Sequence, residues 1–108
     1  MPRPVAYISG PYRSDTIWGI KQNIDKAELC ALVYWKKGYA VICPHKNTAF
    51  LDGVILNDEF IEGDLEFLQR MDPAKGDTIV MMLDWKKSAG AVIEHDEAQG
   101  LGLRIAYE

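Results

Sequence analysis

The segment Ser88–Glu94 brings a serine, glycine and a carboxylate close together directly after an apolar run. Ser88 is a suitable N-cap, so the segment is predicted to begin a helix. Backbone N–H groups at a helix N-terminus, including that of Gly90, bind anions together with a serine hydroxyl, and the helix dipole favours an ionised Glu94. Glu94 is therefore a candidate nucleophile. The alternative is a capping serine followed by a surface glutamate.

A second candidate segment is Gly10-Pro11-Tyr12-Arg13, which follows another short apolar run. The glycine permits a tight turn in which backbone N–H groups approach a ligand. The guanidinium of Arg13 has the fork geometry that suits a phosphate. We therefore interpret this segment as a ligand-binding turn, with an ordinary turn and a solvated arginine as the alternative.

Three single residues complete the candidate set. Asp64 lies beside the apolar stripe of a predicted helix rather than opposite it, which would turn its carboxylate toward a pocket; a surface aspartate is the alternative. His45 and Trp85 each follow a predicted strand. His45 could hydrogen-bond a ligand, and Trp85 could stack on a base, although an aromatic side chain at a sheet edge also serves as packing.

The elements that must position these residues alternate along the chain in the order βαβαβαβ. Apolar runs stopped by glycine or proline predict the strands, and apolar residues at steps of three and four predict the helices. The strands are expected at 5–9, 39–43, 77–83 and 103–107, and the helices at 17–37, 60–71 and 88–101, with a loop at 45–57. This alternation predicts an α/β fold with a doubly wound parallel sheet. The candidate segments then meet at the carboxyl edge of the sheet.

Composition limits the function further. The 108 residues, 48% of them apolar, suit a single domain over residues 1–108. The net charge of -4 argues against a nucleic-acid polymer as a partner. Cys30 and Cys43 form no CxxC pair and are expected to be free thiols, so the sequence implies no metal site. No signal-peptide segment and no apolar run of ~18 residues is found, which predicts a cytoplasmic protein without a membrane partner.

Taken together, the segments Tyr7–Arg13, Asp64–Gln69 and Ser88–Glu94 resemble the nucleoside 2-deoxyribosyltransferase superfamily in order and spacing. The resemblance spans nearly the whole chain. It implies a flavodoxin-like fold with three layers, a homodimer or higher homo-oligomer, and an enzyme that cleaves an N-glycosidic bond of a small nucleotide or nucleoside without a cofactor.

The resemblance also implies roles for three residues. Glu94 matches the nucleophile that attacks the anomeric carbon. Asp64 matches the aspartate that protonates or hydrogen-bonds the departing base or aligns the nucleophile, and Tyr7 matches a tyrosine whose hydroxyl orients the glutamate. Such roles agree with the chemistry, because a fixed carboxylate stabilises and traps an oxocarbenium-like sugar.

The residue at position 88 favours one branch of the superfamily. The transferases tend to carry an acid there, which binds a free 5'-hydroxyl and would repel a phosphate, whereas Ser88 together with Arg13 would accept one. The sequence is therefore most similar to the 2'-deoxynucleoside 5'-phosphate N-hydrolase branch, although Pro11 replaces a phosphate-holding serine of that branch. The predicted activity is hydrolysis of a nucleoside 5'-monophosphate to base and sugar 5-phosphate. The alternatives are a base-exchanging transferase and a non-catalytic nucleotide-binding module. The expected substrate-binding residues are Gly10, Pro11, Tyr12, Arg13, His45, Trp85, Ser88 and Gly90.

Overall fold

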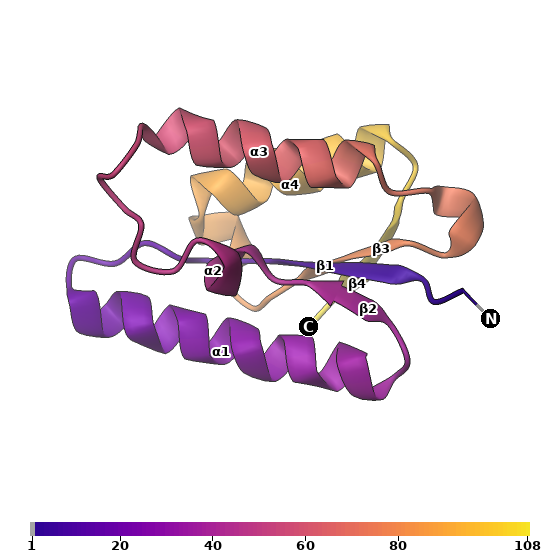
Figure 1. The fold of residues 1–108 in the computed structure, drawn as a ribbon, viewed down its shortest axis with the longest axis horizontal. Coiled ribbons are helices and arrows are strands. Elements are labelled where there is room, and N and C mark those ends of the chain that lie inside the picture. The colour runs from indigo at the N-terminus through magenta and orange to yellow at the C-terminus, as the bar shows by residue number, and fades with distance from the viewer. Residues whose placement is uncertain (1) are drawn as a thin grey trace.

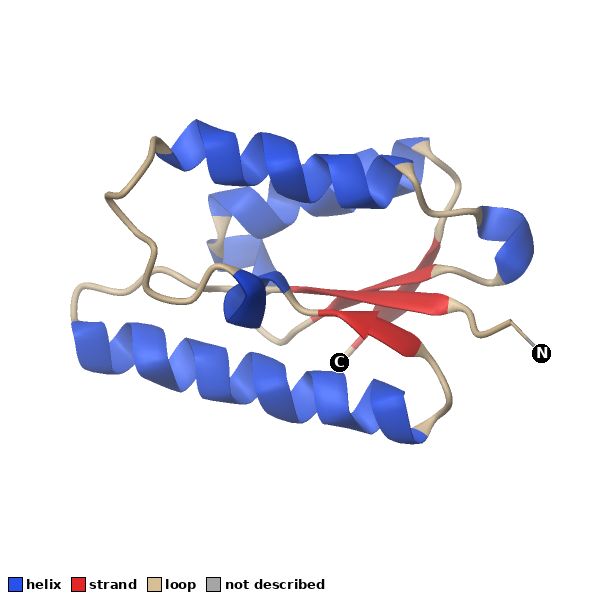
Figure 2. Cartoon of the chain, viewed as in Figure 1, coloured by secondary structure: helices blue, strands red, loops and turns tan. Residues whose placement is uncertain are grey.

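A four-stranded parallel sheet lies between two layers of helices in the computed structural model, which describes residues 2–108 (Figures 1 and 2). The strands are β1 (Val5–Ser9), β2 (Ala40–Ile42), β3 (Thr78–Met81) and β4 (Arg104–Tyr107). Their order is β2-β1-β3-β4, and every neighbouring pair is parallel. This order agrees with the first four strands of a flavodoxin-like sheet. The predicted α/β, doubly wound, three-layer fold is confirmed.

The helices cover both faces of the sheet. They are α1 (Ile17–Lys36), α2 (Pro44–Asn47), α3 (Asn57–Gln69) and α4 (Ala89–Gly100), with two short 3-10 helices, η1 (Pro73–Lys75) and η2 (Trp85–Lys87). Helix α1 lies on one face, and α3 and α4 lie on the other (Figure 1). Within residues 2–108, none of these helices combines the length and the apolar character that crossing a bilayer requires.

The core consists of two clusters, one on each face of the sheet, because side chains alternate in direction along a strand. Tyr7, Ile79 and Met81 point toward α3 and α4, where they pack with Leu68, Met71, Ala91, Ala98 and Leu103. Ala6, Ile8, Val80 and Met82 pack with Ala27, Cys30 and Ala31 of α1. The sheet is therefore fixed from both sides, and its carboxyl edge is left to form a site.

The predicted loop at 45–57 was wrong at both ends. Its first residues belong to the single-turn helix α2, which starts at Pro44, and its last residue begins α3, three residues before the predicted helix at 60–71. Proline suits the first helical position because its missing N–H has no intrahelical partner there. A single turn has no apolar periodicity, so the pattern that revealed the longer helices could not reveal α2.

Candidate active site

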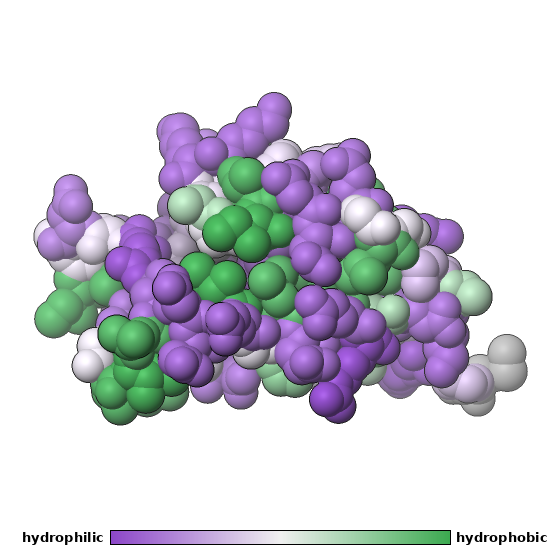
Figure 3. All heavy atoms as spheres, turned by 90° about the horizontal axis from the view of Figure 1, so that it is seen from above, coloured by the Kyte–Doolittle hydropathy of each residue, from purple (hydrophilic) through white to green (hydrophobic). Residues whose placement is uncertain are grey.

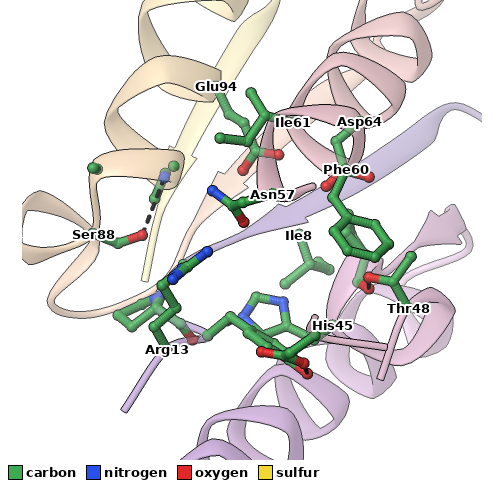
Figure 4. Close-up of a pocket in the computed structure, with 18 of the residues that line it drawn as sticks. Ile8, Arg13, His45, Thr48, Asn57, Phe60, Ile61, Asp64, Ser88 and Glu94 are labelled. Atoms are coloured by element: carbon green, nitrogen blue, oxygen red, sulfur yellow. Dashed lines mark hydrogen bonds between the residues drawn. The ribbon is translucent and has the colours of Figure 1, made fainter. Parts of the chain in front are cut away.

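A cavity of about 390 Å³ opens at the carboxyl edge of the sheet (Figure 4). Its walls come from the end of β1, from α2 and the loop that follows it, from α3, and from the start of α4. The candidate residues that line it are Gly10, Pro11, Tyr12, Arg13, His45, Asp64, Ser88, Gly90 and Glu94. The expectation that distant segments meet at this edge is confirmed.

Glu94 is held at the cavity by two hydroxyl groups of β1. The Tyr7 hydroxyl donates to Oε2 of Glu94, and the Ser9 hydroxyl donates to Oε1 over 2.7 Å. Tyr7 and Ser9 are two residues apart on one strand, so their side chains project from the same face of the sheet. With one donor on each oxygen, the orientation of the carboxylate is fixed before any ligand arrives.

Burial governs the protonation of Glu94. It raises the pKa of Glu94 to about 7, against the opposing effect of the Tyr7 and Ser9 donors and with a smaller raising contribution from the charge of Asp64. The helix dipole was expected to favour the ionised form of Glu94. That expectation was wrong, because burial disfavours the ionised form and because Glu94 lies in the second turn of α4, beyond the first turn in which the dipole mainly acts.

A second carboxyl group, that of Asp64, faces the same cavity from α3 (Figure 4). Burial raises its pKa to about 6. The pKa of the Tyr7 hydroxyl is raised far above its usual range by burial and by the nearby Glu94, so Tyr7 remains a hydrogen-bond donor. Two carboxyl groups that titrate near neutrality in one cavity provide the elements of acid and nucleophilic catalysis.

Cationic and N–H groups gather at another part of the cavity. Arg13 and Lys87 line it, together with the first residues of α4. The Ser88 hydroxyl caps α4 by accepting a hydrogen bond from the Ala91 N–H over 3.1 Å. The N–H group of Gly90 belongs to the first turn, where helix geometry provides no intrahelical acceptor. This end of the cavity is therefore suited to an anion.

Two further contacts shape the cavity wall. The His45 Nε2 lies 2.8 Å from the carbonyl oxygen of Pro11, and burial lowers the pKa of His45. A neutral His45 therefore donates to Pro11 and fixes the segment after β1. The Tyr12 hydroxyl donates to Asp52 over 2.5 Å and accepts from the Phe50 N–H over 2.8 Å, which joins that segment to the loop before α3.

Gly10 is required by the packing behind the cavity. A Cβ atom at this position would lie 2.6 Å from the Cβ of Met82, which is closer than carbon atoms approach in proteins. The segment after β1 therefore passes directly over the end of β3. Gly10 is therefore required by this close approach to Met82, whereas the predicted tight turn is not observed, because residues 10–13 form no turn and Gly10 does not have a positive φ.

The family to which this chain belongs follows from its sequence as a whole. A family model described as a domain of unknown function, DUF4406, matches residues 4–107. The chain is a member of the DUF4406 family. No curated protein and no solved structure matches it.

Trp85 of this DUF4406 chain lies outside the cavity. Its ring stacks on His95, with centroids 4.3 Å apart, and it also lies near Tyr107 of β4. It packs against the apolar cluster that includes Met81 and Leu103. The position of Trp85 therefore does not support the prediction that it binds substrate. It agrees with the alternative, in which Trp85 is a packing residue.

Sequence reasoning missed several residues of the DUF4406 site. Ser9 lies within the Tyr7–Arg13 segment but was given no role, although its two-residue spacing from Tyr7 places both side chains on one face of the strand. Phe60 and Ile61 lie within the helix predicted at 60–71 and were given no role, yet they line the cavity. Lys87 lies beside Ser88 and adds positive charge, but an exposed lysine is usually only a solvated residue. Other lining residues had no signal in the pattern: Thr48, Asp52, Gly53, Ile55 and Asn57. Within residues 2–108, no group of three or more His, Cys, Asp or Glu side chains is placed to hold a metal ion.

Proposed function

We propose that this chain is an enzyme that hydrolyses the N-glycosidic bond of a nucleoside 5'-monophosphate. The observation that carries the proposal is the Glu94 carboxyl group, fixed by Tyr7 and Ser9 in a cavity that also holds the carboxyl group of Asp64. The resemblance to the nucleoside 2-deoxyribosyltransferase superfamily points to the same chemistry. We further propose a small-molecule substrate rather than a nucleic-acid polymer, in keeping with the acidic composition. We also propose a cytoplasmic location.

The proposed reaction proceeds in two steps. In the first, an oxygen of ionised Glu94 bonds to the anomeric carbon, the bond from this carbon to the base nitrogen breaks, and Asp64 gives its proton to the departing base. In the second, Asp64 takes a proton from water, whose oxygen bonds to the anomeric carbon and releases Glu94. The products are the free base and the sugar 5-phosphate, and both carboxyl groups return to their starting states.

The pKa values set the fraction of enzyme that is ready to react. The first step needs Glu94 ionised and Asp64 protonated, although the pKa of Glu94, about 7, exceeds that of Asp64, about 6. At pH 6.5 about one molecule in seventeen carries this arrangement, if the two groups titrate independently. The expected pH profile is therefore a bell centred near pH 6.5, with a maximum that rises when the two pKa values approach each other.

The cationic end of the cavity favours a phosphorylated substrate. Arg13 and the N-terminal turn of α4 are suited to a 5'-phosphate. Lys87 also lines this end of the cavity, with its ammonium 3.6 Å from Asp84. No acidic side chain stands at position 88 to bind a free 5'-hydroxyl. This feature favours hydrolysis of nucleotides over base exchange between nucleosides.

Base release measured by chromatography tests the proposal. The purified protein is incubated with each common ribonucleoside and deoxyribonucleoside 5'-monophosphate and with the matching nucleosides. We expect base release from at least one nucleotide, and much slower release from its nucleoside. Adding a second free base should give no new nucleoside, because a hydrolase transfers the sugar only to water. A new nucleoside would indicate a transferase.

A pair of variants separates catalysis at the cavity from other causes. Glu94→Ala should abolish base release, whereas Glu97→Ala, also on α4, should retain it because Glu97 does not line the cavity. Calorimetry with the same nucleotides completes the test. Tight binding without any turnover would overturn the proposal in favour of a non-catalytic binding module.

A further inference from the structure

The segment between β1 and α1 is held in place by side chains rather than by its own backbone. Residues 10–15 belong to no helix or strand, and no backbone–backbone hydrogen bond joins them to the rest of residues 2–108. The amide of Asn23 bonds two of their carbonyl groups instead. Its Nδ2 donates to the Tyr12 oxygen over 3.0 Å and to the Arg13 oxygen over 3.3 Å. Because backbone polar groups need partners, such contacts determine where the segment lies.

Asn23 lies in the second turn of α1 and is half-buried. Both of its partners are carbonyl oxygens, which only accept hydrogen bonds, so the amide nitrogen and not the amide oxygen must face them. Asparagine is less favourable than alanine inside a helix. The stability of α1 alone therefore does not explain this residue, whereas its two contacts with the preceding segment do.

The contacts of Asn23 reach the cavity through Arg13. The Arg13 side chain lines the cavity on the side where Ser88 lies (Figure 4). It is exposed, and among residues 2–108 no ion pair fixes its guanidinium. Its direction therefore depends on its backbone. The Tyr12 and Arg13 carbonyl groups belong to the two peptide units on either side of the Arg13 α-carbon, and each peptide unit is planar, so bonding both of them fixes the direction in which the side chain leaves the chain.

Two other contacts hold the same segment at different atoms. His45 of α2 bonds the Pro11 carbonyl, and the Tyr12 hydroxyl bonds the loop between α2 and α3. That loop carries exposed apolar side chains, and hydrophobic atoms are visible at the end of the molecule where Figure 1 places it (Figure 3). Of these anchors, only Asn23 bonds both peptide units that adjoin Arg13. It also belongs to a long helix packed on the sheet, and helices hold a group more precisely than loops do.

We propose that Asn23 is a positioning residue for recognition of the 5'-phosphate. By holding both peptide units that adjoin Arg13, it directs the guanidinium toward the cationic end of the cavity before a ligand binds. Asn23 does not line the cavity, so it acts through Arg13. An oriented guanidinium loses less freedom on binding, which increases affinity for a phosphate. The inference rests on the proposed function for the identity of the ligand, a nucleoside 5'-monophosphate, but not for the catalytic step.

Calorimetric titration with each common nucleoside 5'-monophosphate and its nucleoside tests this role. All proteins carry Glu94→Ala, so that the proposed reaction does not consume the ligand. Asn23→Ala should weaken nucleotide binding about three- to tenfold, the effect of losing ordinary hydrogen bonds, and should leave nucleoside binding unchanged. The variant should fold, because alanine is the better helix former. Gln22→Ala, at the exposed neighbouring position of α1, should bind nucleotides as the reference protein does.

A double variant identifies the route of the effect. Arg13→Ala should weaken nucleotide binding about tenfold or more. Adding Asn23→Ala to it should cause no further loss, because the group that Asn23 positions is already absent. A further three- to tenfold loss would overturn the proposal, since Asn23 would then act by another route. Nucleotide binding by Asn23→Ala at the reference affinity, or equal weakening for nucleotide and nucleoside, would overturn it too.

Nitrogen relaxation of the ligand-free protein provides a second measurement. The heteronuclear NOE of the Arg13 backbone amide should fall in Asn23→Ala but not in Gln22→Ala, because only the former frees the segment. An unchanged NOE, or a reference protein that binds no nucleotide, would contradict the inference. Nucleotide binding that depends on Asn23 in a wild-type protein that releases no base would instead refute the hydrolase and support the role of Asn23.

Discussion

Replacement of Glu94 by glutamine should stabilise the fold at alkaline pH. The group has an ordinary pKa of 4.5 and a folded-state pKa of about 7. Below pH 4.5 both the folded and the unfolded chain hold this carboxyl group protonated. As the pH rises from 4.5 to 7, the unfolded chain ionises first, and stability is lost until the folded chain ionises too. At about 1.4 kcal/mol per pKa unit, the loss amounts to about 3 kcal/mol.

Urea unfolding of wild type and Glu94→Gln at pH 4 and pH 8 measures this loss. Glutamine keeps the shape of the side chain and the acceptor for Tyr7, but it does not ionise. The free energy of unfolding of the variant, relative to wild type, should therefore be higher at pH 8 than at pH 4 by about 3 kcal/mol. Glu97→Gln should show no comparable change. An equal difference between wild type and Glu94→Gln at the two pH values would refute the reasoning that burial raises this pKa.

The remaining predictions concern the cavity. Tyr7→Phe removes a hydrogen bond worth about 1.5–3 kcal/mol, which should raise the pKa of Glu94 by about 1–2. The maximum of kcat/KM should then fall about 10- to 100-fold, and the alkaline limb of its pH profile should move to higher pH. Asp64→Asn should reduce base release about 10²- to 10⁴-fold and abolish the alkaline limb. Arg13→Ala should raise KM for nucleotides about tenfold or more while leaving release from nucleosides unchanged, as steady-state kinetics would show. Gly10→Ala should lower the free energy of unfolding by about 1–3 kcal/mol in urea titrations, because the new methyl group meets Met82.

The sequence was sufficient to predict the layers of this fold because its signals are local. Apolar steps of three and four marked α1, and Gly38, with φ of +93°, follows the helix in the left-handed conformation that glycine adopts readily at such an end. The serine that caps α4 was found in the same way, from its place before an apolar stretch. Parallel strands then bring their carboxyl ends to one edge, which is why Arg13, Asp64 and Glu94 could be placed around one cavity.

The features that sequence reasoning missed depend on the surroundings of each group in space. The protonation of Glu94 is set by the burial of its carboxyl group, which only the packed structure reveals. Trp85 was expected in the cavity because it follows a strand, but η2 turns it toward His95. Asn57 lines the cavity because of the orientation of α3, which no local sequence pattern predicts.

Mass spectrometry of the enzyme quenched during turnover tests the central claim most directly. The account predicts a covalent adduct with the mass of a sugar phosphate, mapped to the peptide that contains Glu94. The same treatment should leave Glu94→Ala unmodified, while Glu97→Ala forms the adduct as wild type does. Base release by the Glu94→Ala variant at the wild-type rate, or an adduct on another residue, would contradict the assignment of Glu94 as the nucleophile.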